Sequence, residues 1–340
     1  MTHADGRFAV HIDGVATPVL CRPDEPILDA ALAQGLALPH NCRGGACGTC
    51  RATLLSGATS EGWIQSFALT DEDREEGRIL PCVARPQSDC RIRLNTALAT
   101  TAAVAARRIG ATVVACEAVA PAVRRLVLEP DAVLPWRAGG QVRLVLPGIF
   151  PDRVYSIASQ VTGDDRLRDN QIELFIAIRP GGLAGRVVEG LEPGWRVELD
   201  GPHGTLAIPD RADRIVMVAG GTGLSPLLSL ARQALARGET RPMLLLFSVP
   251  GPRDLFALDA LKALVAYPNF TYRLCLTRVS SSGFADAHYG RVTGMLGRLV
   301  GPGTAVLAAG SAQFGADVRT VARDHGVDPA AILVDSFLPA

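Results

Sequence analysis

The sequence predicts a multidomain protein of mixed α+β and α/β class, with a β-grasp unit first, an antiparallel β-barrel second and a doubly wound parallel sheet last. The chain has 340 residues, which is long for one domain and ordinary for two or three. Short alternating strands separated by Gly and Pro fill its middle part, as in an antiparallel barrel. After about residue 211 the order becomes strand, helix, strand, which is typical of a parallel sheet.

Composition excludes several classes of function. The 34 basic and 34 acidic side chains cancel, so the chain lacks the net positive charge that attracts nucleic acid or an anionic membrane. Apolar residues make up 48% and charged residues 20%, which is a globular composition. The uncharged apolar run 215–231 is broken by glycines and Pro226 and is shorter than the ~20 residues of a spanning helix. Without a recognisable leader, we expect a cytoplasmic protein that binds neither nucleic acid nor membrane.

The first unit, residues 1–95, is expected to contain a hairpin, a helix and a closing strand. Apolar residues alternate over 8–12 and are followed by Asp13-Gly14, a hairpin signal that leads to a second strand over 15–20. The remaining expected elements are a helix over 27–32, with Asp24 as its N-cap and Gly35 as its stop, and a last strand over 91–94.

Four of the eight cysteines have the spacing of an iron–sulfur ligand set. The pattern Cys-x4-Cys-x2-Cys followed at a distance by a fourth cysteine is that of plant-type 2Fe–2S sites. The ligands are Cys42, Cys47, Cys50 and Cys82. Small residues between the first three let the loop wrap around the cluster and donate backbone N–H groups to it. The alternative is a zinc site, although zinc usually takes a second Cys-x2-Cys pair or histidines. The other four cysteines are expected in the core.

A linker and a barrel are expected next. Residues 96–106 carry no charge until Arg107 and are mostly small, so we interpret them as a linker, with a helix as the alternative. The barrel then spans 107–210. Its expected strands include 125–129, 141–146, 172–178 and 196–199.

The last domain, 211–340, opens with a strand over 214–219 that leads into Gly220-Gly221-Thr222-Gly223. Parallel sheets bind ligands at the carboxyl ends of their strands, where this turn is expected. Its spacing is not G-x-G-x-x-G, so by itself it indicates a tight turn as well as a dinucleotide site. A helix follows, with Ser225 as N-cap, Pro226 in the first turn and Gly238 as stop. Further strands are expected over 243–248, 271–277, 304–309 and 331–334, and helices over 255–265, 292–299 and 316–325.

The barrel segment also contains a motif that suits a flavin. In Arg153-Val154-Tyr155-Ser156, the Arg can neutralise a pyrophosphate and the Tyr, on the same strand face, can cover a planar ring. The Ser can hydrogen-bond a heteroatom of that ring. Taken alone, these four residues are better explained by an ordinary strand.

In their order along the chain, these motifs resemble the reductase components of bacterial multicomponent oxygenases, in which a plant-type ferredoxin domain is fused to a ferredoxin–NADP⁺ reductase-like module. The resemblance covers nearly the whole chain and rests also on the Pro180–Gly185 turn, on Gly201-Pro202-His203-Gly204 and on the 219–226 segment. It implies an NAD(P)H:acceptor oxidoreductase that passes electrons through FAD and a 2Fe–2S cluster to a partner oxygenase. The partner implied first is a Rieske-type aromatic-ring dioxygenase of aromatic hydrocarbon catabolism. The alternatives are a di-iron monooxygenase or a deoxysugar-forming enzyme as partner, or a redox carrier or sensor with weak turnover.

The resemblance also implies site residues. The Arg-x-Tyr-Ser segment and the Pro-Gly-Gly turn hold the flavin in this family, and the glycine turn after the first strand of the last domain holds the dinucleotide. The implied flavin residues are Arg153, Tyr155, Ser156, Arg179, Gly181, Gly182 and Gly185. The implied dinucleotide residues are Gly220, Gly221, Thr222, Gly223, Gly310 and Arg278. The residues expected at the reacting rings are Tyr155, Ser156, Thr222 and Phe337.

Two departures from the family pattern affect the site. Gly185 replaces the usual Ser or Thr, which leaves only a backbone N–H for one phosphate contact. Ala309-Gly310-Ser311 replaces Cys-Gly-Pro, so the thiol beside the nicotinamide is missing and ring alignment is expected to depend on Thr222 and backbone. The ending Asp335-Ser336-Phe337 resembles the family's acidic-x-Phe, with a core position for Phe337 as the alternative.

The sequence gives weaker signals for the choice of nicotinamide and flavin cofactor and for partner binding than for the domains. No basic cluster follows 243–248, which favours NADH, whereas Arg278 is placed to accept the 2′-phosphate of NADPH. FAD follows from the family, and FMN is its alternative. The acidic run 71–76 is expected to be a solvated helix start, with docking of a basic partner as the alternative. We expect a monomer.

Overall fold

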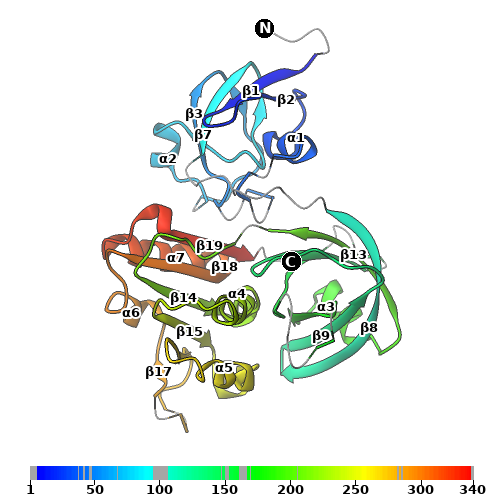
Figure 1. Cartoon of the computed structure of the whole chain (residues 1–340), viewed down its shortest axis with the longest axis vertical. Helices are drawn as coiled ribbons and strands as arrows, with labels where there is room; N and C mark the ends of the chain where they lie inside the picture. The colour runs from blue at the N-terminus through cyan, green and yellow to red at the C-terminus, as the bar shows by residue number, and fades with distance from the viewer. Residues whose placement is uncertain are drawn as a thin grey trace. The chain divides into compact units, whose positions relative to one another are not determined.

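The computed structural model describes residues 6–36, 38–40, 43–45, 48–66, 68–94, 106–146, 148–149, 153–160, 167–168, 170–204, 206–281, 283–284 and 286–337. The described chain falls into two compact units, one holding residues up to 94 with 334–337, the other holding 106–333. Figure 1 labels their elements. The expected linker 96–106 lies outside the described residues apart from Ala106, so it and the domain boundaries remain predictions.

The first unit is built on a five-stranded mixed sheet with the order β2-β1-β7-β3-β5. Strands β1 and β2 form the expected antiparallel hairpin, whereas β1 and β7 run parallel. The strands are β1 (Phe8–Ile12), β2 (Val19–Cys21), β3 (Ala52–Ser56), β5 (Arg78–Ile79) and β7 (Cys90–Leu94), and a small ribbon joins β4 (Thr59–Ser60) and β6 (Arg85–Pro86). Helices α1 (Ile27–Ala33) and α2 (Asp71–Glu75) complete the unit, and α1 buries its apolar face in the core of the sheet. This arrangement confirms the predicted β-grasp unit.

Helix α1 begins without the predicted cap. Its N-cap is Pro26, not Asp24, and no side chain accepts a bond there. Instead the backbone N–H of Ile27 donates to Ala84 O (3.0 Å), and that of Leu28 donates to Pro81 O (2.9 Å). These two bonds satisfy N–H groups that a capping side chain normally serves. They also fasten α1 to the loop around Cys82.

The predicted barrel is formed by six antiparallel strands in the order β11-β10-β13-β8-β9-β12. An isolated antiparallel bridge between Ile157, just after β11, and Leu174 on β12 joins the two ends of this sheet and closes it. The strands are β8 (Arg107–Ala120), β9 (Val123–Pro130), β10 (Gln141–Val145), β11 (Arg153–Ser156), β12 (Ile172–Ala177) and β13 (Arg196–His203), and the barrel carries the short helix α3 (Leu183–Glu189).

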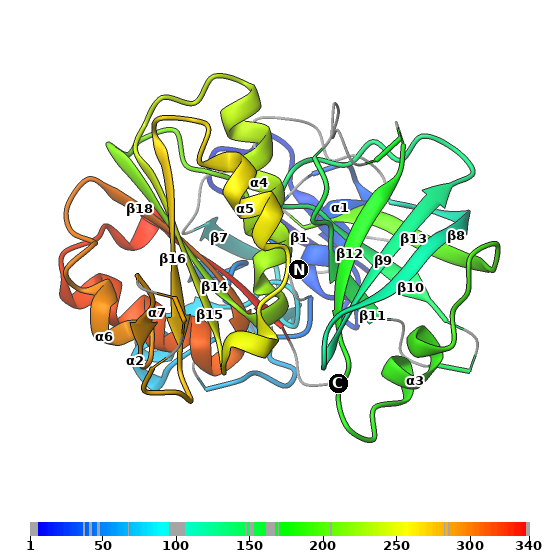
Figure 2. The same ribbon diagram turned by 90° about the horizontal axis from the view of Figure 1, so that it is seen from below.

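A six-stranded sheet of order β17-β16-β15-β14-β18-β19 follows, and strands β14 to β18 run parallel within it. Helices α4 and α5 lie on the face turned toward the barrel, and α6 and α7 lie on the other face (Figure 2). The strands are β14 (Arg214–Gly220), β15 (Met243–Val249), β16 (Phe270–Leu276), β17 (His288–Tyr289), β18 (Thr304–Ser311) and β19 (Ile332–Phe337). The helices are α4 (Leu224–Ala236), α5 (Leu258–Leu264), α6 (Thr293–Leu296) and α7 (Ala312–Asp324). The doubly wound sheet is therefore confirmed.

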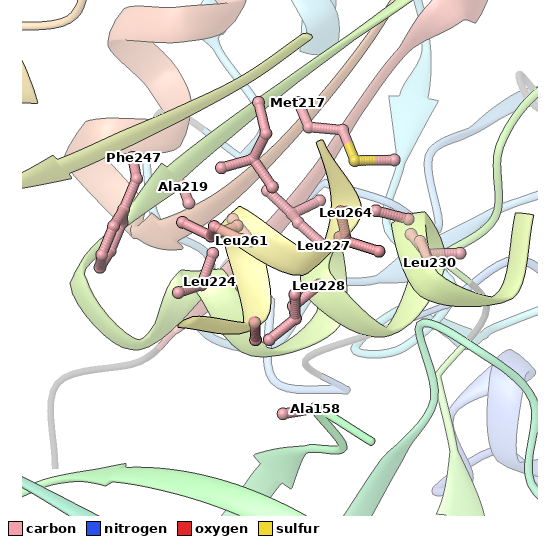
Figure 3. Packing of buried hydrophobic residues seen from close by; sticks show 14 of the residues in the cluster. Ala158, Met217, Ala219, Leu224, Leu227, Leu228, Leu230, Phe247, Leu261 and Leu264 are labelled. Carbon is pink, nitrogen blue, oxygen red and sulfur yellow. The ribbon is translucent and has the colours of Figure 1, made fainter. Parts of the chain in front are cut away.

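Helix α4 packs against the parallel sheet through its apolar residues. Leu224, Leu227 and Leu228 are fully buried against β14 and β15, and Ala158 from the barrel belongs to the same apolar cluster (Figure 3). The helix starts directly from the 3-10 turn Gly221–Gly223, so its N-cap is Gly223 and Ser225 is its second residue. The prediction of Ser225 as N-cap is wrong, because the turn continues into the helix without a break.

Three polar contacts join the barrel to α4 within the second unit. The Ser229 hydroxyl donates to Ser159 O (2.6 Å), and Arg232 Nη1 donates to Ala158 O (2.9 Å). Arg232 also pairs with the buried carboxylate of Glu173 on β12 (3.3 Å). The segment that follows β11 is thereby held against the helix that follows β14. Among the described residues, no helix combines the length and apolar character needed to cross a membrane.

Candidate functional site

The carboxyl ends of β14 and β18 form the topological switch point of the parallel sheet. From β14 the chain proceeds to β15, β16 and β17 on one side, and then returns to β18 on the other. Ala219 on β14 lies opposite Ala309 on β18, so the turn 220–223 and the residues 310–311 lie side by side. Open parallel sheets bind ligands at such a point. The structure thus brings the predicted dinucleotide residues Gly220–Gly223 and Gly310 together.

Two glycines of the turn have identifiable physical roles. Gly221 has a φ of +54°, a left-handed conformation that side chains rarely adopt. A Cβ on Gly223 would overlap the carbonyl oxygen of Ala309. The turn therefore packs directly onto the end of β18, and only glycine permits this approach.

Phe314 is a residue of this site that the sequence reasoning missed. A Cβ built on Gly310 would lie 2.9 Å from Phe314 Cδ1, and one on Gly220 would lie 3.2 Å from the same ring. The phenyl ring, on the first turn of α7, therefore packs over both glycines. The Gly-x-x-x-Phe spacing of 310–314 places the ring one helical turn after the strand. This spacing is the feature of the sequence from which Phe314 could have been predicted.

The start of α4 offers donors for a phosphate. Ser225 is 1% exposed, and among the described residues its hydroxyl has no hydrogen-bond partner. It lies in the first turn of a 13-residue helix that continues directly from the 3-10 turn Gly221–Gly223. A buried hydroxyl that lacks a hydrogen-bond partner, beside a glycine turn, can donate to the pyrophosphate of a dinucleotide. Thr222, half-buried in the same turn, is the only side chain among 220–223, and its role at the nicotinamide ring stays a prediction.

The flavin motif forms β11, next to β10. Arg153 and Tyr155 lie on one face of this strand, and Val154 on the other face is 44% exposed. Ser156 is buried opposite Gln141. Burial raises the pKa of the Tyr155 phenol to about 12, and the charge of Arg153 opposes this only partly. A cation, a neutral aromatic ring and a hydroxyl at positions 153, 155 and 156 suit an anionic, planar flavin nucleotide.

The second flavin segment lies close to the first. Because the Ile157–Leu174 bridge is antiparallel, the chain entering at Arg153 runs beside the chain leaving β12 toward Arg179. There the backbone turns sharply: Gly182 N–H donates to Arg179 O (3.0 Å), and Gly181 has a φ of +77°. Gly185 is buried against Ile178 as the third residue of α3, where its N–H has no intrahelical acceptor.

Two further predicted residues stand at strand ends. Arg278 is exposed just after β16, and its backbone N–H donates to Pro250 O (2.8 Å), which ties it to the end of β15. Phe337 is the half-buried last residue of β19. Their predicted contacts with a 2′-phosphate and with the flavin ring remain predictions.

Half of the predicted cluster ligands lie within the described residues. Cys50 and Cys82 are 4% and 5% exposed, while Cys42 and Cys47 lie outside the described residues. The loop between the ligands has the backbone that the prediction requires, since Gly45 and Gly48 have φ values of +73° and +70°. A Cβ on Gly48 would lie 2.9 Å from Ala68 O, so this loop is tightly enclosed. Buried thiols within a wrapped, glycine-containing loop fit a thiolate-bound cluster.

The other four cysteines behave largely as predicted. Cys21, Cys90 and Cys275 are buried and Cys116 is half-buried. Burial raises the pKa of the Cys21 and Cys275 thiols to about 12. These thiols stay protonated and are unsuited to bind metal.

Comparison with known proteins agrees with this geometry. Residues 10–87 match the 2Fe-2S iron-sulfur cluster binding domain, and residues 217–319 match the oxidoreductase NAD-binding domain. The reductase subunit of aromatic O-demethylase from Amycolatopsis sp. is 37% identical over 78% of this chain and 79% of that protein. The toluate 1,2-dioxygenase electron transfer component of Pseudomonas putida is 30% identical over 96% of both chains. The crystal structure of Amycolatopsis cytochrome P450 reductase GcoB superimposes with a TM-score of 0.76 at 31% identity, over 98% of this chain and 99% of that one.

These matches confirm the predicted oxidoreductase and its cofactor set of a 2Fe–2S cluster, FAD and NAD(P)H, and they favour iron over the zinc alternative. They also confirm the predicted resemblance. The chain belongs to the family of reductase components that join a 2Fe–2S ferredoxin domain to a flavin- and nicotinamide-dependent oxidoreductase module and serve oxygenase systems.

Proposed function

We propose that this protein passes electrons from NADH to the terminal component of an oxygenase that acts on an aromatic compound. One observation carries the proposal: the hydrogen bond from Ser229 to Ser159 O (2.6 Å) links the dinucleotide helix to the flavin segment. Ser159 lies three residues after Ser156, and Ser229 lies on the helix opened by the 220–223 turn. The residues assigned to the two nucleotides are therefore held by one rigid contact, as hydride transfer between stacked rings requires.

Bound FAD would supply the conversion of two-electron into one-electron chemistry, and a bound 2Fe–2S cluster would supply one-electron transfer. The chain's own residues bind and orient these groups. Arg153 neutralises phosphate charge, and the Tyr155 phenol, with its pKa near 12, stays neutral and covers the ring. Ser225 and the glycine turn 220–223 receive the dinucleotide phosphates. No side chain is assigned as an acid or base, because hydride transfer needs none.

The proposed acceptor is a Rieske-type aromatic-ring dioxygenase. The toluate 1,2-dioxygenase electron transfer component supports this choice, because it aligns with 96% of the chain. A monooxygenase is the second candidate, favoured by the 37% identity to the aromatic O-demethylase reductase subunit and by the fit to a cytochrome P450 reductase.

The first test is an anaerobic visible spectrum of the purified protein, followed by separate additions of NADH and NADPH. We expect flavin and 2Fe–2S absorbance, bleached rapidly by NADH and more slowly by NADPH. Reduction assays with a purified Rieske dioxygenase and a purified cytochrome P450 then compare the two acceptors. A spectrum that neither nucleotide bleaches contradicts the reductase and leaves the sensor alternative.

We further propose a monomer located in the cytoplasm. The cysteines outside the ligand set support this compartment, because they form no disulfide and a reducing environment keeps them so: Cys21, Cys90, Cys116 and Cys275. Size-exclusion chromatography with light scattering measures the oligomeric state, and a dimer mass would overturn the monomer.

A further inference from the structure

The second unit contains a cavity of about 400 Å³ beside the contact between β12 and α4. This volume lies within the range of small-molecule sites. Strands β8, β9 and β12 of the barrel supply part of its lining, and α4, α5 and the segment before α5 supply the rest. The described residues that line it include none of those assigned to the flavin or to the dinucleotide. The proposed function therefore does not account for this cavity.

Part of the lining is apolar and aromatic. Phe175 on β12 and Phe256 in the segment before α5 are 5% and 3% exposed, and their ring centroids lie 4.9 Å apart. Ala257, the next residue of the lining, has a φ of +55°, a left-handed conformation that is uncommon for a residue with a Cβ. Strained backbone of this kind gathers at ligand sites. The aromatic part of the lining fits an apolar ring.

Another part of the lining carries charge. Glu173 is 4% exposed and pairs with both Arg125 and Arg232, so one carboxylate faces two guanidinium groups. Arg125 donates from Nε to Glu173 and from Nη1 to Glu117, and its Nη2 donates to no atom of the described residues. Three basic and two acidic side chains line the cavity, which leaves one positive charge in excess. A monoanion complements this charge better than a dianion does.

Lys262 on α5 supplies one of these positive charges, and it is the only lysine in the 340-residue chain. Its side chain is 65% exposed, and its Nζ lies 3.8 Å from Asp259 Oδ1, which is longer than a hydrogen bond. A lysine ammonium is a compact charge on a flexible stem. Lys262 can therefore turn its N–H groups toward a carboxylate in the cavity.

We propose that this cavity binds a small aromatic monocarboxylate. Its ring packs on Phe175 and Phe256, and its carboxylate accepts hydrogen bonds from Arg125 Nη2 and Lys262 Nζ. A ligand held by the barrel and by α5 at once stabilises the second unit, because it binds the folded state alone. The inference goes beyond the proposed function and does not depend on it, since binding requires neither NADH nor electron transfer.

The first test is isothermal titration calorimetry of the full chain in its oxidised, cofactor-loaded form, with benzoate as the probe. We expect a dissociation constant below about 1 mM. Benzamide keeps the ring without the charge, and acetate keeps the charge without the ring, so each should bind at least about tenfold more weakly. Sulfate, a dianion, should also bind more weakly. Binding of benzamide, acetate or sulfate as tightly as benzoate would overturn the assigned class of ligand.

The only lysine gives a second readout, which needs no variant. N-hydroxysuccinimidyl acetate acetylates amines, and the chain offers it the Lys262 amine and the α-amino group. At a benzoate concentration of twice the dissociation constant, acetylation of Lys262 should slow about threefold, because about two thirds of the sites are then occupied. Acetylation of the α-amino group should not change. Peptide mass spectrometry measures both rates, and equal slowing of the two, or of neither, would overturn the proposal.

Lys262→Gln tests the cation directly. It should weaken benzoate binding about fivefold, as expected for an exposed ion pair, whereas Lys262→Arg keeps the charge and should retain most of the affinity. The matched control is Arg237→Gln, which removes an exposed positive charge at the end of α4, outside the cavity, and should leave binding unchanged. Equal losses in Lys262→Gln and Arg237→Gln would reveal a non-specific charge effect and overturn the site. Displacement of benzoate by NAD⁺ would also overturn it, because the cavity would then belong to the dinucleotide site.

Discussion

At the scale of single residues, Gly223 shows how the dinucleotide turn depends on a missing side chain. Any Cβ there overlaps Ala309 O, so Gly223→Ala must push the turn away from β18. We expect a loss of about 1–3 kcal/mol in the free energy of unfolding and a raised KM for NADH. Urea unfolding and steady-state kinetics measure both. Gly283→Ala is the control, since no atom of the residues that the structure describes lies within 4 Å of its Cβ position and its backbone is not left-handed.

Phe314 and Gly310 form a pair whose coupling can be measured. Gly310→Ala places a Cβ 2.9 Å from the phenyl ring, so the ring must move. Removing the ring as well, in Gly310→Ala/Phe314→Ala, relieves this clash. We expect a double-mutant cycle on the free energy of unfolding to give a coupling of about 0.5–3 kcal/mol. Additive effects, within about 0.5 kcal/mol, would show that the ring does not pack on the glycine in solution.

At the scale of elements, the contact between β12 and α4 holds the barrel against the parallel sheet. Glu173 is 4% exposed and pairs with Arg125 and Arg232. Glu173→Ala leaves two guanidinium groups without this carboxylate, and we expect a cost of about 3–5 kcal/mol in the free energy of unfolding. Glu117→Gln removes the exposed second partner of Arg125 and should cost no more than about 1 kcal/mol. Equal costs for the two variants would contradict a buried, structural role for Glu173.

The turn between α4 and β15 gives the protein a specific response to acid. Hydrogen bonds from Arg241 lower the pKa of Glu239 from 4.5 to about 2. A carboxylate with a depressed pKa stabilises the folded state above its unfolded pKa, and this contribution is lost as the pH falls from about 4.5 to about 2. We expect Glu239→Gln to lower stability by about 1–2 kcal/mol at pH 7, because water screens part of the interaction. Thermal unfolding from pH 7 to pH 2 measures the difference in stability between the wild type and Glu239→Gln. This difference should disappear as the pH falls from about 4.5 to about 2. A difference that stays constant would show that the loss of stability has another cause.

Elements differed in how well the sequence predicted them. Alternating strands and the strong apolar strands of the parallel sheet were predicted to within a few residues, because their pattern reports burial directly. Helix starts were predicted poorly: Asp24 and Ser225 do not cap, since α1 is capped by carbonyls of the 81–84 loop and α4 continues from a 3-10 turn. The expected helix over 292–299 shortens to Thr293–Leu296. Contacts distant in sequence decide such boundaries, and single-chain patterns do not contain them.

The same limit applies to the site. Local motifs predicted the glycine turn, Arg153-x-Tyr155-Ser156 and the cysteine set, and the roles of these residues stay predictions. The Arg232–Glu173 pair and the Ser229–Ser159 hydrogen bond join residues 59 and 70 positions apart. Only the folded chain shows them.

At the scale of the whole molecule, the two units have separate apolar cores, so loss of the cluster should leave the second unit functional. Cys82→Ser removes a predicted ligand, and Cys90→Ser removes an equally buried thiol that lies outside the ligand set. We expect Cys82→Ser to lose iron and sulfide and to stop reducing cytochrome c, while NADH-driven ferricyanide reduction continues at the wild-type rate. Cys90→Ser should keep its cluster and both activities. If Cys82→Ser also lost ferricyanide reduction with its flavin still bound, electrons would have to leave only through the first unit. Iron analysis, the visible spectrum and the two assays decide among these outcomes.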